Sequence, residues 1–241
     1  MLKKFIKNKL DNYSFVRGDI NLNDRNGMLH RVWGYVFSNH LFGDYIEFGV
    51  YKGDSFAKSI NQYKKFKLWL KDQKKSSEAW RVKVAQQSEL NNEIYFHGLD
   101  TFEGMPSNNE KSFVFSKGNF YSSYEEVKKK ISKLNQKFFL YKGLFLSNKN
   151  QIKNNLKNRK AAIVNFDCDL YQSTIDAFEI IDENLQIGTA LIFDDYNSFN
   201  ANNSEGQRRA LKEIQDRYKW IIEPFFHYMY IGQVFLIVGK K

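Results

Sequence analysis

The 241-residue sequence is 42% hydrophobic and 17% aromatic and has only two prolines, which suits one α/β domain with a sizeable core and excludes a disordered chain. Its single cysteine, Cys168, excludes an intramolecular disulfide. The 37 Lys and Arg outnumber the 27 Asp and Glu by ten, which admits a polyanionic or acidic partner. The lysines are dispersed through polar helical stretches without an arginine-rich block, so we interpret them as a solvated surface and do not expect a nucleic acid partner.

The apolar runs are far shorter than the ~18 residues of a membrane-spanning helix. Residues 1–10 carry lysines but not the apolar core of a signal peptide. We therefore expect a soluble, cytoplasmic protein without a membrane span, with one domain over residues 1–241. Residues 1–43 form an N-terminal extension rich in apolar side chains, which could cover the active site or a neighbouring subunit and leaves a homo-oligomer open.

After residue 44, short apolar segments alternate with helical patterns, which is typical of an α/β fold with a mostly parallel sheet. The seven predicted strands are residues 45–48, 94–99, 138–142, 161–166, 189–193, 220–223 and 233–239. No helical pattern separates the last two strands, so the final strand is predicted to be antiparallel. We predict a doubly wound, Rossmann-like sheet of order 3-2-1-4-5-7-6 with helices on both faces.

Serines mark the starts of several predicted helices. Ser122 and Ser123 stand three residues before two glutamates, a capping box that predicts a helix over about residues 123–135. Ser173 or Thr174 is predicted to cap the helix after the fourth strand, and Ser204 another. Residues 56–92 are too long for a single crossover and predict one long or two shorter inserted helices between the first two strands.

The first predicted strand runs into Glu47-Phe48-Gly49-Val50-Tyr51-Lys52-Gly53-Asp54-Ser55. Glycines here allow a tight turn and a close approach to a ligand before a helix, although a purely structural turn is the alternative. The stretch has neither the G-x-G-x-x-G spacing nor the G-K-[ST] ending, so a dinucleotide or a nucleoside triphosphate is not specifically indicated.

Acidic residues follow three of the predicted strands. Asp100 is placed to accept hydrogen bonds from the ribose hydroxyls of a nucleoside, or else it caps a helix or turn. Asp167 and Asp169 follow the fourth strand, and Asp194 and Asp195 follow the fifth. In the predicted strand order these carboxylates and the glycine loop converge on one crevice, where their mutual repulsion favours a divalent cation.

Oxygen-only ligands favour Mg²⁺ for this crevice. The alternative is that Asp169 and Asp195 cap the following helices and bind no metal. Zinc is disfavoured because the four histidines are dispersed and the cysteine is single. A nucleophilic role of Cys168 is disfavoured because its aspartate neighbours suppress the thiolate, and no G-x-S-x-G motif indicates a hydrolase.

Four segments in order resemble the macrocin O-methyltransferase family: Glu47 to Gly53, Leu99-Asp100-Thr101-Phe102-Glu103-Gly104-Met105-Pro106, Asp167-Cys168-Asp169-Leu170-Tyr171-Gln172-Ser173-Thr174, and Phe193-Asp194-Asp195-Tyr196. The resemblance covers about residues 44–210. It implies an S-adenosylmethionine-dependent, Mg²⁺-assisted methyltransferase acting on a hydroxyl of a sugar or glycan-like small molecule, since characterised members methylate sugar hydroxyls of macrolide and aminocoumarin antibiotics. The chain departs from the pattern at Asp54, Cys168 and Asn197.

The resemblance also implies roles for individual residues. It assigns Asp167, Asp194 and Asp195 to the metal and Asp100 to the ribose. The predicted cofactor site comprises Glu47, Gly49, Tyr51, Gly53, Ser55, Asp100, Thr101 and Phe102.

A base must still take the proton of the acceptor hydroxyl. Asp169 is the first candidate, because it lies two residues from a metal ligand. His227 is the second, although it could instead pack among its aromatic neighbours. The lysine excess is compatible with an anionic or nucleotide-linked acceptor. Two other hypotheses stay open: the same fold methylating a nucleic acid, and a non-catalytic module that binds a nucleoside ligand or a partner protein.

Overall fold

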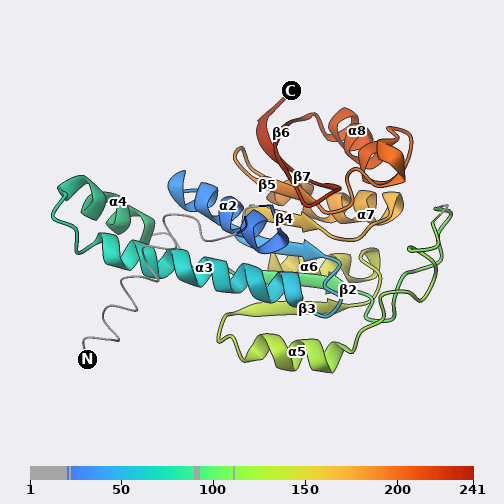
Figure 1. The fold of residues 1–241 in the computed structure, drawn as a ribbon, viewed down its shortest axis with the longest axis horizontal. Helices are drawn as coiled ribbons and strands as arrows, with labels where there is room; N and C mark the ends of the chain where they lie inside the picture. The colour runs from blue at the N-terminus through green and yellow to red at the C-terminus, as the bar shows by residue number, and fades with distance from the viewer. Residues whose placement is uncertain (1–20, 22, 90–92, 111) are drawn as a thin grey trace.

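The computed structural model describes residues 21, 23–89, 93–110 and 112–241 (Figure 1). Residues 1–20 and 22 of the predicted N-terminal extension therefore lie outside the described residues, as do residues 90–92 of the predicted insertion. A seven-stranded sheet forms the centre of the molecule, in the order β3-β2-β1-β4-β5-β7-β6. Its strands are β1 (Asp44–Phe48), β2 (Phe96–Asp100), β3 (Phe138–Lys142), β4 (Ala161–Phe166), β5 (Ala190–Phe193), β6 (Trp220–Tyr228) and β7 (Gly232–Lys240).

The predicted strand order is confirmed. Strands β1 to β5 pair in parallel, whereas β7 pairs antiparallel with both β5 and β6. Only three residues separate β6 from β7, which is enough for a hairpin and far too few for a parallel crossover. Strand β2 lies slightly later than predicted, and β6 and β7 are longer than predicted because the hairpin continues their pairing.

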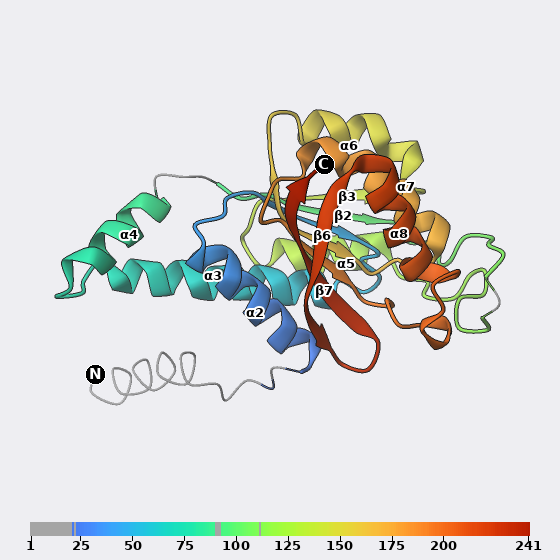
Figure 2. The ribbon, with the colours of Figure 1, turned by 90° about the horizontal axis from the view of Figure 1, so that it is seen from above.

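Helices cover both faces of the sheet, as predicted (Figures 1 and 2). On one face lie α2 (Arg25–Ser38), α3 (Asp54–Gln73) and α5 (Tyr124–Ser132), and on the other α6 (Lys149–Asn155), α7 (Tyr171–Ile181) and α8 (Gly206–Tyr218). Each layer encloses its own apolar cluster. Tyr45 of β1 belongs to one cluster and Ile46 and Phe48 to the other, because successive side chains of a strand point to opposite faces.

The predicted insertion forms two helices. Helix α3 begins at Asp54, directly after the glycine loop, and its buried side chains Phe56, Ile60, Tyr63, Phe66 and Leu70 follow the predicted stripe. Figure 1 shows α3 running along the sheet and past its edge, with α4 (Ala79–Glu89) at its far end. The crossover and the inserted arm are therefore one continuous helix followed by a second, short one.

The predicted caps have mixed outcomes. Ser123 caps α5 as expected, accepting a hydrogen bond from the Glu126 amide at 3.4 Å. The prediction for α7 is wrong, because α7 begins at Tyr171 and Thr174 lies inside it, donating to the Leu170 carbonyl at 2.9 Å. Ser204 is not the cap of α8, whose N-cap is Glu205 without a side-chain hydrogen bond.

Candidate active site

The carboxyl ends of four neighbouring strands lie level with one another. Phe48 of β1 is in register with Leu99 of β2 and with Phe166 of β4, and Phe166 is in register with Phe193 of β5. The next residue of each strand therefore emerges at the same edge of the sheet. These four residues are Gly49, Asp100, Asp167 and Asp194.

Gly49 allows the loop after β1 to pass directly against the end of β4. Its backbone has φ +91°, and a Cβ atom there would lie 1.7 Å from the Asp167 carbonyl oxygen. A side chain at this position is thus excluded both by backbone conformation and by space. The loop and the Asp167 backbone consequently lie in direct contact.

Asp100 organises the same loop. Its Oδ2 accepts hydrogen bonds from the amides of Val50 at 2.8 Å and Tyr51 at 2.7 Å, and its Oδ1 accepts from the Phe102 amide at 2.7 Å. Burial raises the pKa of Asp100, and these amide hydrogen bonds oppose the rise. Each carboxylate oxygen has two lone pairs, so Asp100 retains acceptor capacity toward the cavity that it lines.

Glu47 lies beneath the loop. It is fully buried, accepts a hydrogen bond from the Ser55 hydroxyl at 2.6 Å, and pairs with the Tyr45 hydroxyl. Burial raises the pKa of Glu47 from 4.5 to about 7, while the hydrogen bonds from Ser55 and Tyr45 lower it. Glu47 is not among the described residues that line the cavity, so its side chain supports the loop from below.

We expect Glu47→Gln to stabilise the protein increasingly as pH rises. The folded-state pKa of about 7 exceeds the ordinary value of 4.5, so folding favours the protonated carboxyl. The contribution of protonated Glu47 to the free energy of unfolding is fully present below about pH 4.5. It is lost as pH rises through about 7, and the loss is about 3 kcal/mol. Thermal unfolding of both proteins at about pH 5 and about pH 8 measures the difference. The exposed Glu103→Gln is the control, and an equal offset at both pH values would contradict the buried, neutral Glu47.

Three aspartates form the acidic centre of the site. Asp167, Asp194 and Asp195 each offer a carboxylate oxygen, and these atoms lie within 4.8 Å of one another. Burial raises the pKa of Asp167 well above its usual range, and the charge of Asp194 raises it further. An all-oxygen set of this density suits Mg²⁺, which relieves such repulsion.

Asp169 is the fourth carboxylate of the cluster. It lines the cavity, has φ +59°, and shares a hydrogen bond with Asp195. Burial and the Asp195 charge both raise the pKa of Asp169 well above its usual range. Asp169 does not cap α7, whose N-cap is Leu170 with no side-chain hydrogen bond, so that alternative explanation of Asp169 is wrong.

Two side chains that contact the acidic centre were missed by the sequence interpretation. The Arg25 guanidinium, at the start of α2, donates to Asp167 at 2.9 Å and also to Asp194. The buried Tyr228 hydroxyl donates to the other Asp194 oxygen at 2.6 Å. A strand pattern that buries Tyr228 would have indicated a polar partner for its hydroxyl, whereas nothing in the sequence near Arg25 indicates its contacts.

His227 does not reach the site. It is exposed, whereas its neighbour Tyr228 is buried, because consecutive side chains of β6 point to opposite faces. His227 is also not among the described residues lining the cavity. The structure therefore brings Asp169, and not His227, to the acidic centre.

The other predicted cofactor residues separate into two groups. Gly49, Tyr51, Ser55, Asp100 and Thr101 line the cavity. Gly53 and Phe102 do not: Gly53 is the N-cap of α3 with φ +74°, and Phe102 packs in the apolar core. These two residues shape the loops, and the first group faces the ligand space.

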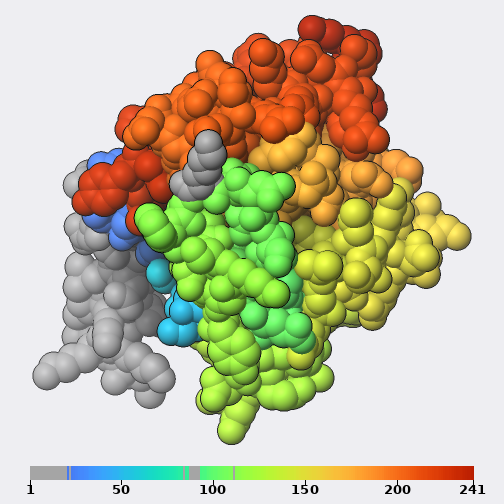
Figure 3. Space-filling view, turned by 90° about the vertical axis from the view of Figure 1, so that its right-hand side faces the viewer, coloured from blue at the N-terminus to red at the C-terminus, as the bar shows by residue number. Residues whose placement is uncertain are grey.

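A cavity of about 1310 Å³ opens above this edge of the sheet. Figure 3 looks onto the edge and shows the green segment that follows β2 lying across its middle. This segment is tied down: Glu110 accepts the amide of Tyr171 at the start of α7 at 2.9 Å, and the rings of Phe115 and Phe199 lie 5.7 Å apart. The cavity thus has a floor of strand ends and a wall made by residues 101–110 and 112–120.

The charges around the cavity are mostly negative. Among the described lining residues, the cations are Arg25, Lys52 and Arg209, and the carboxylates are Asp54, Asp100, Glu110, Asp167, Asp169, Asp176, Asp194, Asp195 and Glu205. The lysine excess of the sequence therefore lies mainly outside the cavity. A polyanion is not the ligand that this lining favours.

Comparison with known proteins identifies the family. A family model for macrocin-O-methyltransferase (TylF) matches residues 80–227, which is more than half of the chain. The chain belongs to this family. It is accordingly an O-methyltransferase enzyme, and the hypothesis of a non-catalytic binding module is set aside.

Solved structures show the same fold. The chain is similar to the O-methyltransferase NovP, with 16% identity, a TM-score of 0.62, and coverage of 89% of this chain and 80% of that one. It is also similar to CalS11, described as a calicheamicin methyltransferase, with 17% identity, a TM-score of 0.64, and coverage of 99% and 93%. An O-methyltransferase from Bacillus cereus in complex with SAH has 13% identity, a TM-score of 0.52, and coverage of 88% and 81%.

These structural likenesses confirm the Rossmann-like fold of this O-methyltransferase. No curated protein sequence matches the chain. Within the described residues, no helix of this family member combines the length and apolar character needed to cross a bilayer.

Proposed function

We propose that this family member transfers a methyl group from S-adenosylmethionine to a hydroxyl of a sugar or glycan-like small molecule, with Mg²⁺ held by Asp167, Asp194 and Asp195. The observation that carries the proposal is the convergence of these three carboxylates, within 4.8 Å of one another, on a cavity that Asp100 and the glycine loop also line. The family of the chain supports the reaction. A structural neighbour described as a TDP-rhamnose 3′-O-methyltransferase supports the acceptor class.

The residues of the glycine loop fit the methyl donor. Gly49 exposes backbone where a side chain is excluded, and Asp100 Oδ1, which accepts one amide hydrogen bond, keeps an acceptor position suited to a ribose hydroxyl. Tyr51 and Thr101 line the same part of the cavity. S-Adenosylmethionine, when bound, supplies an electrophilic methyl group on a sulfonium, so the protein has to bind and orient it rather than activate it.

The acidic centre fits the metal and the acceptor. Mg²⁺, when bound, lowers the pKa of a ligating hydroxyl and fixes its position. Asp169 lines the cavity beside Asp195 and is not one of the three grouped ligands, so its carboxylate is positioned to act as the base for the proton of the acceptor hydroxyl. Residues 101–110 and 112–120 form one side of the cavity.

The finer identity of the acceptor rests on charge and size. The predominantly acidic lining favours a neutral hydroxyl compound over a nucleic acid, whose phosphates would be repelled. The carboxylates that would hold Mg²⁺ are balanced by its charge, so the lining is also compatible with a nucleotide-linked sugar such as the one named for the TDP-rhamnose neighbour. Neutral sugars, glycosides and nucleotide-linked sugars are thus the acceptors to test, by mass spectrometry of methylated products.

We expect Asp100→Ala to weaken binding of S-adenosylhomocysteine by roughly tenfold or more, since a buried, charged acceptor of hydrogen bonds is lost. Isothermal titration calorimetry of the full chain measures this change. The matched control is Glu103→Ala, three residues along the same loop and exposed, which should bind like the wild type. Unchanged binding by Asp100→Ala would refute the ribose contact.

A further inference from the structure

The side chain of Arg25 is engaged with the carboxylates that the proposed metal requires. Its Nη1 donates to Asp167 Oδ2 at 2.9 Å, and its Nη2 donates to Asp194 Oδ2. The second oxygen of Asp194 accepts the Tyr228 hydroxyl at 2.6 Å. Both oxygens of Asp194 and one oxygen of Asp167 are therefore already bound by groups of the protein itself.

A divalent cation and a guanidinium compete for such oxygens. Both are positive, and the carboxylates are largely buried, with side-chain exposures of 16% for Asp167 and 15% for Asp194. Burial reduces solvent screening, so the two cations repel each other more strongly than they would at the surface. The fork of Arg25 also spans the two carboxylates through separate nitrogens, which occupies the space between them.

We propose that Arg25 is the resident counter-ion of the acidic centre and that a divalent cation binds by displacing it, so that Arg25 sets the metal affinity of the enzyme. The inference rests on the metal assignment of the proposed function. Arg25 lies outside the four sequence motifs, and the proposal gives it the role of controlling metal affinity. Arg25 offsets the repulsion between Asp167 and Asp194 until the metal replaces it.

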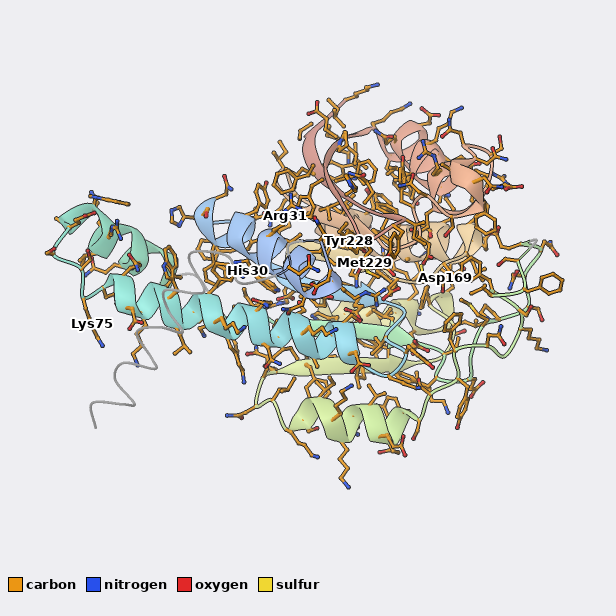
Figure 4. All side chains as sticks on the ribbon, in the orientation of Figure 1. His30, Arg31, Lys75, Asp169, Tyr228 and Met229 are labelled. Atoms are coloured by element: carbon orange, nitrogen blue, oxygen red, sulfur yellow. The ribbon has the colours of Figure 1, made fainter. Side chains whose placement is uncertain are left out.

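The position of Arg25 links metal binding to helix α2. Arg25 is the first residue of α2, and Asp24 caps the helix by accepting the Gly27 amide at 2.7 Å. The preceding Asn23 carbonyl accepts the Met229 amide at 2.7 Å, next to Tyr228. Figure 4 shows Tyr228 and Met229 beside α2, with Asp169 to their right. Release of Arg25 therefore removes the ion pairs that hold the first turn of α2 to the acidic centre. The hydrogen bond between the Met229 amide and the Asn23 carbonyl stays.

The test measures Mn²⁺ affinity of the full chain by electron paramagnetic resonance, in the wild type and in Arg25→Gln. Loss of a competing charge-assisted contact should make Mn²⁺ binding roughly tenfold tighter in Arg25→Gln. Arg25→Lys keeps a positive charge and should restore affinity toward that of the wild type. Arg31→Gln is the matched control, because Arg31 lies on the same helix with its guanidinium over the Phe226 ring at 3.4 Å. Unchanged or weaker Mn²⁺ binding by Arg25→Gln overturns the proposal.

Hydrogen exchange of the wild type gives a second readout that needs no folded variant. Added Mn²⁺ should speed amide exchange in the first turn of α2, around Gly27 and Met28, if Arg25 is released; unchanged or slower exchange there overturns the displacement. Asp167→Asn separates the two proposals. If it abolishes Mn²⁺ binding while Arg25→Gln does not tighten it, the metal assignment stands and the role of Arg25 fails. If neither the wild type nor Arg25→Gln binds Mn²⁺ at a site sensitive to Asp167→Asn, both proposals fail.

Discussion

Chelation with excess EDTA should reduce methyl transfer to background while S-adenosylhomocysteine still binds. The acidic centre and the glycine loop are separate groups of residues on adjacent strand ends, so removal of the metal leaves Gly49 and Asp100 in place. A metal that activates and positions the acceptor contributes several kcal/mol, and Asp167→Asn should therefore lower kcat by roughly 10²–10³-fold. Product formation is followed by mass spectrometry and cofactor binding by calorimetry.

The matched control for Asp167→Asn is Asp176→Asn. Asp176 also lines the cavity but stands on α7, where it accepts a hydrogen bond from Gln172 at 2.7 Å outside the acidic centre. It should retain activity near that of the wild type. Full turnover of the wild type in excess EDTA would refute the metal assignment and leave the methyltransferase family assignment intact.

Asp169→Asn should lower kcat by roughly 10²–10⁴-fold, the usual effect of removing a general base. The variant suits its position, because asparagine tolerates the positive φ of +59° that Asp169 adopts. Asp169 is not one of the three carboxylates grouped as metal ligands, so Mn²⁺ and S-adenosylhomocysteine should bind with affinities close to those of the wild type. Single-turnover kinetics with saturating donor isolates the chemical step.

His227→Gln supplies the contrast. The side chain is exposed on β6 and lies outside the described cavity lining, so its removal should leave kcat unchanged. A large loss in His227→Gln together with an active Asp169→Asn would reverse the assignment of the base.

The strands were predictable from local patterns, and their order and the edge that carries the site were predictable from the connection rules of doubly wound sheets. Apolar segments separated by helical patterns predict parallel strands, and the carboxyl ends of parallel strands meet at one edge. Asp100 ends β2, and Asp167 and Asp194 directly follow β4 and β5, so their convergence follows from the topology alone. The start of α7 was mispredicted, because Glu110, far along the chain, satisfies the helix end in place of a local serine.

Other features depended on which face of an element is buried. His227 and Tyr228 are adjacent, and a shift of one residue decides which of them faces Asp194. Glu47 stands in the first motif, yet its side chain is enclosed by Tyr45 and Ser55 rather than exposed to the cavity. Alternation along a strand predicts which side chains share a face of the sheet. Only the packing of the whole chain shows which other side chains that face contacts.

The sequence by itself determined the strands, the loop that approaches the ligand space and the aspartates at the strand ends, since each is encoded by neighbouring residues. The tertiary structure alone decided that Arg25 lies among those aspartates, because the contact joins residues 142 and 169 positions apart. It also decided the balance of charge. The chain carries a net +10, yet the cavity lining is mostly acidic, because composition averages over a surface that folding divides between solvent and site.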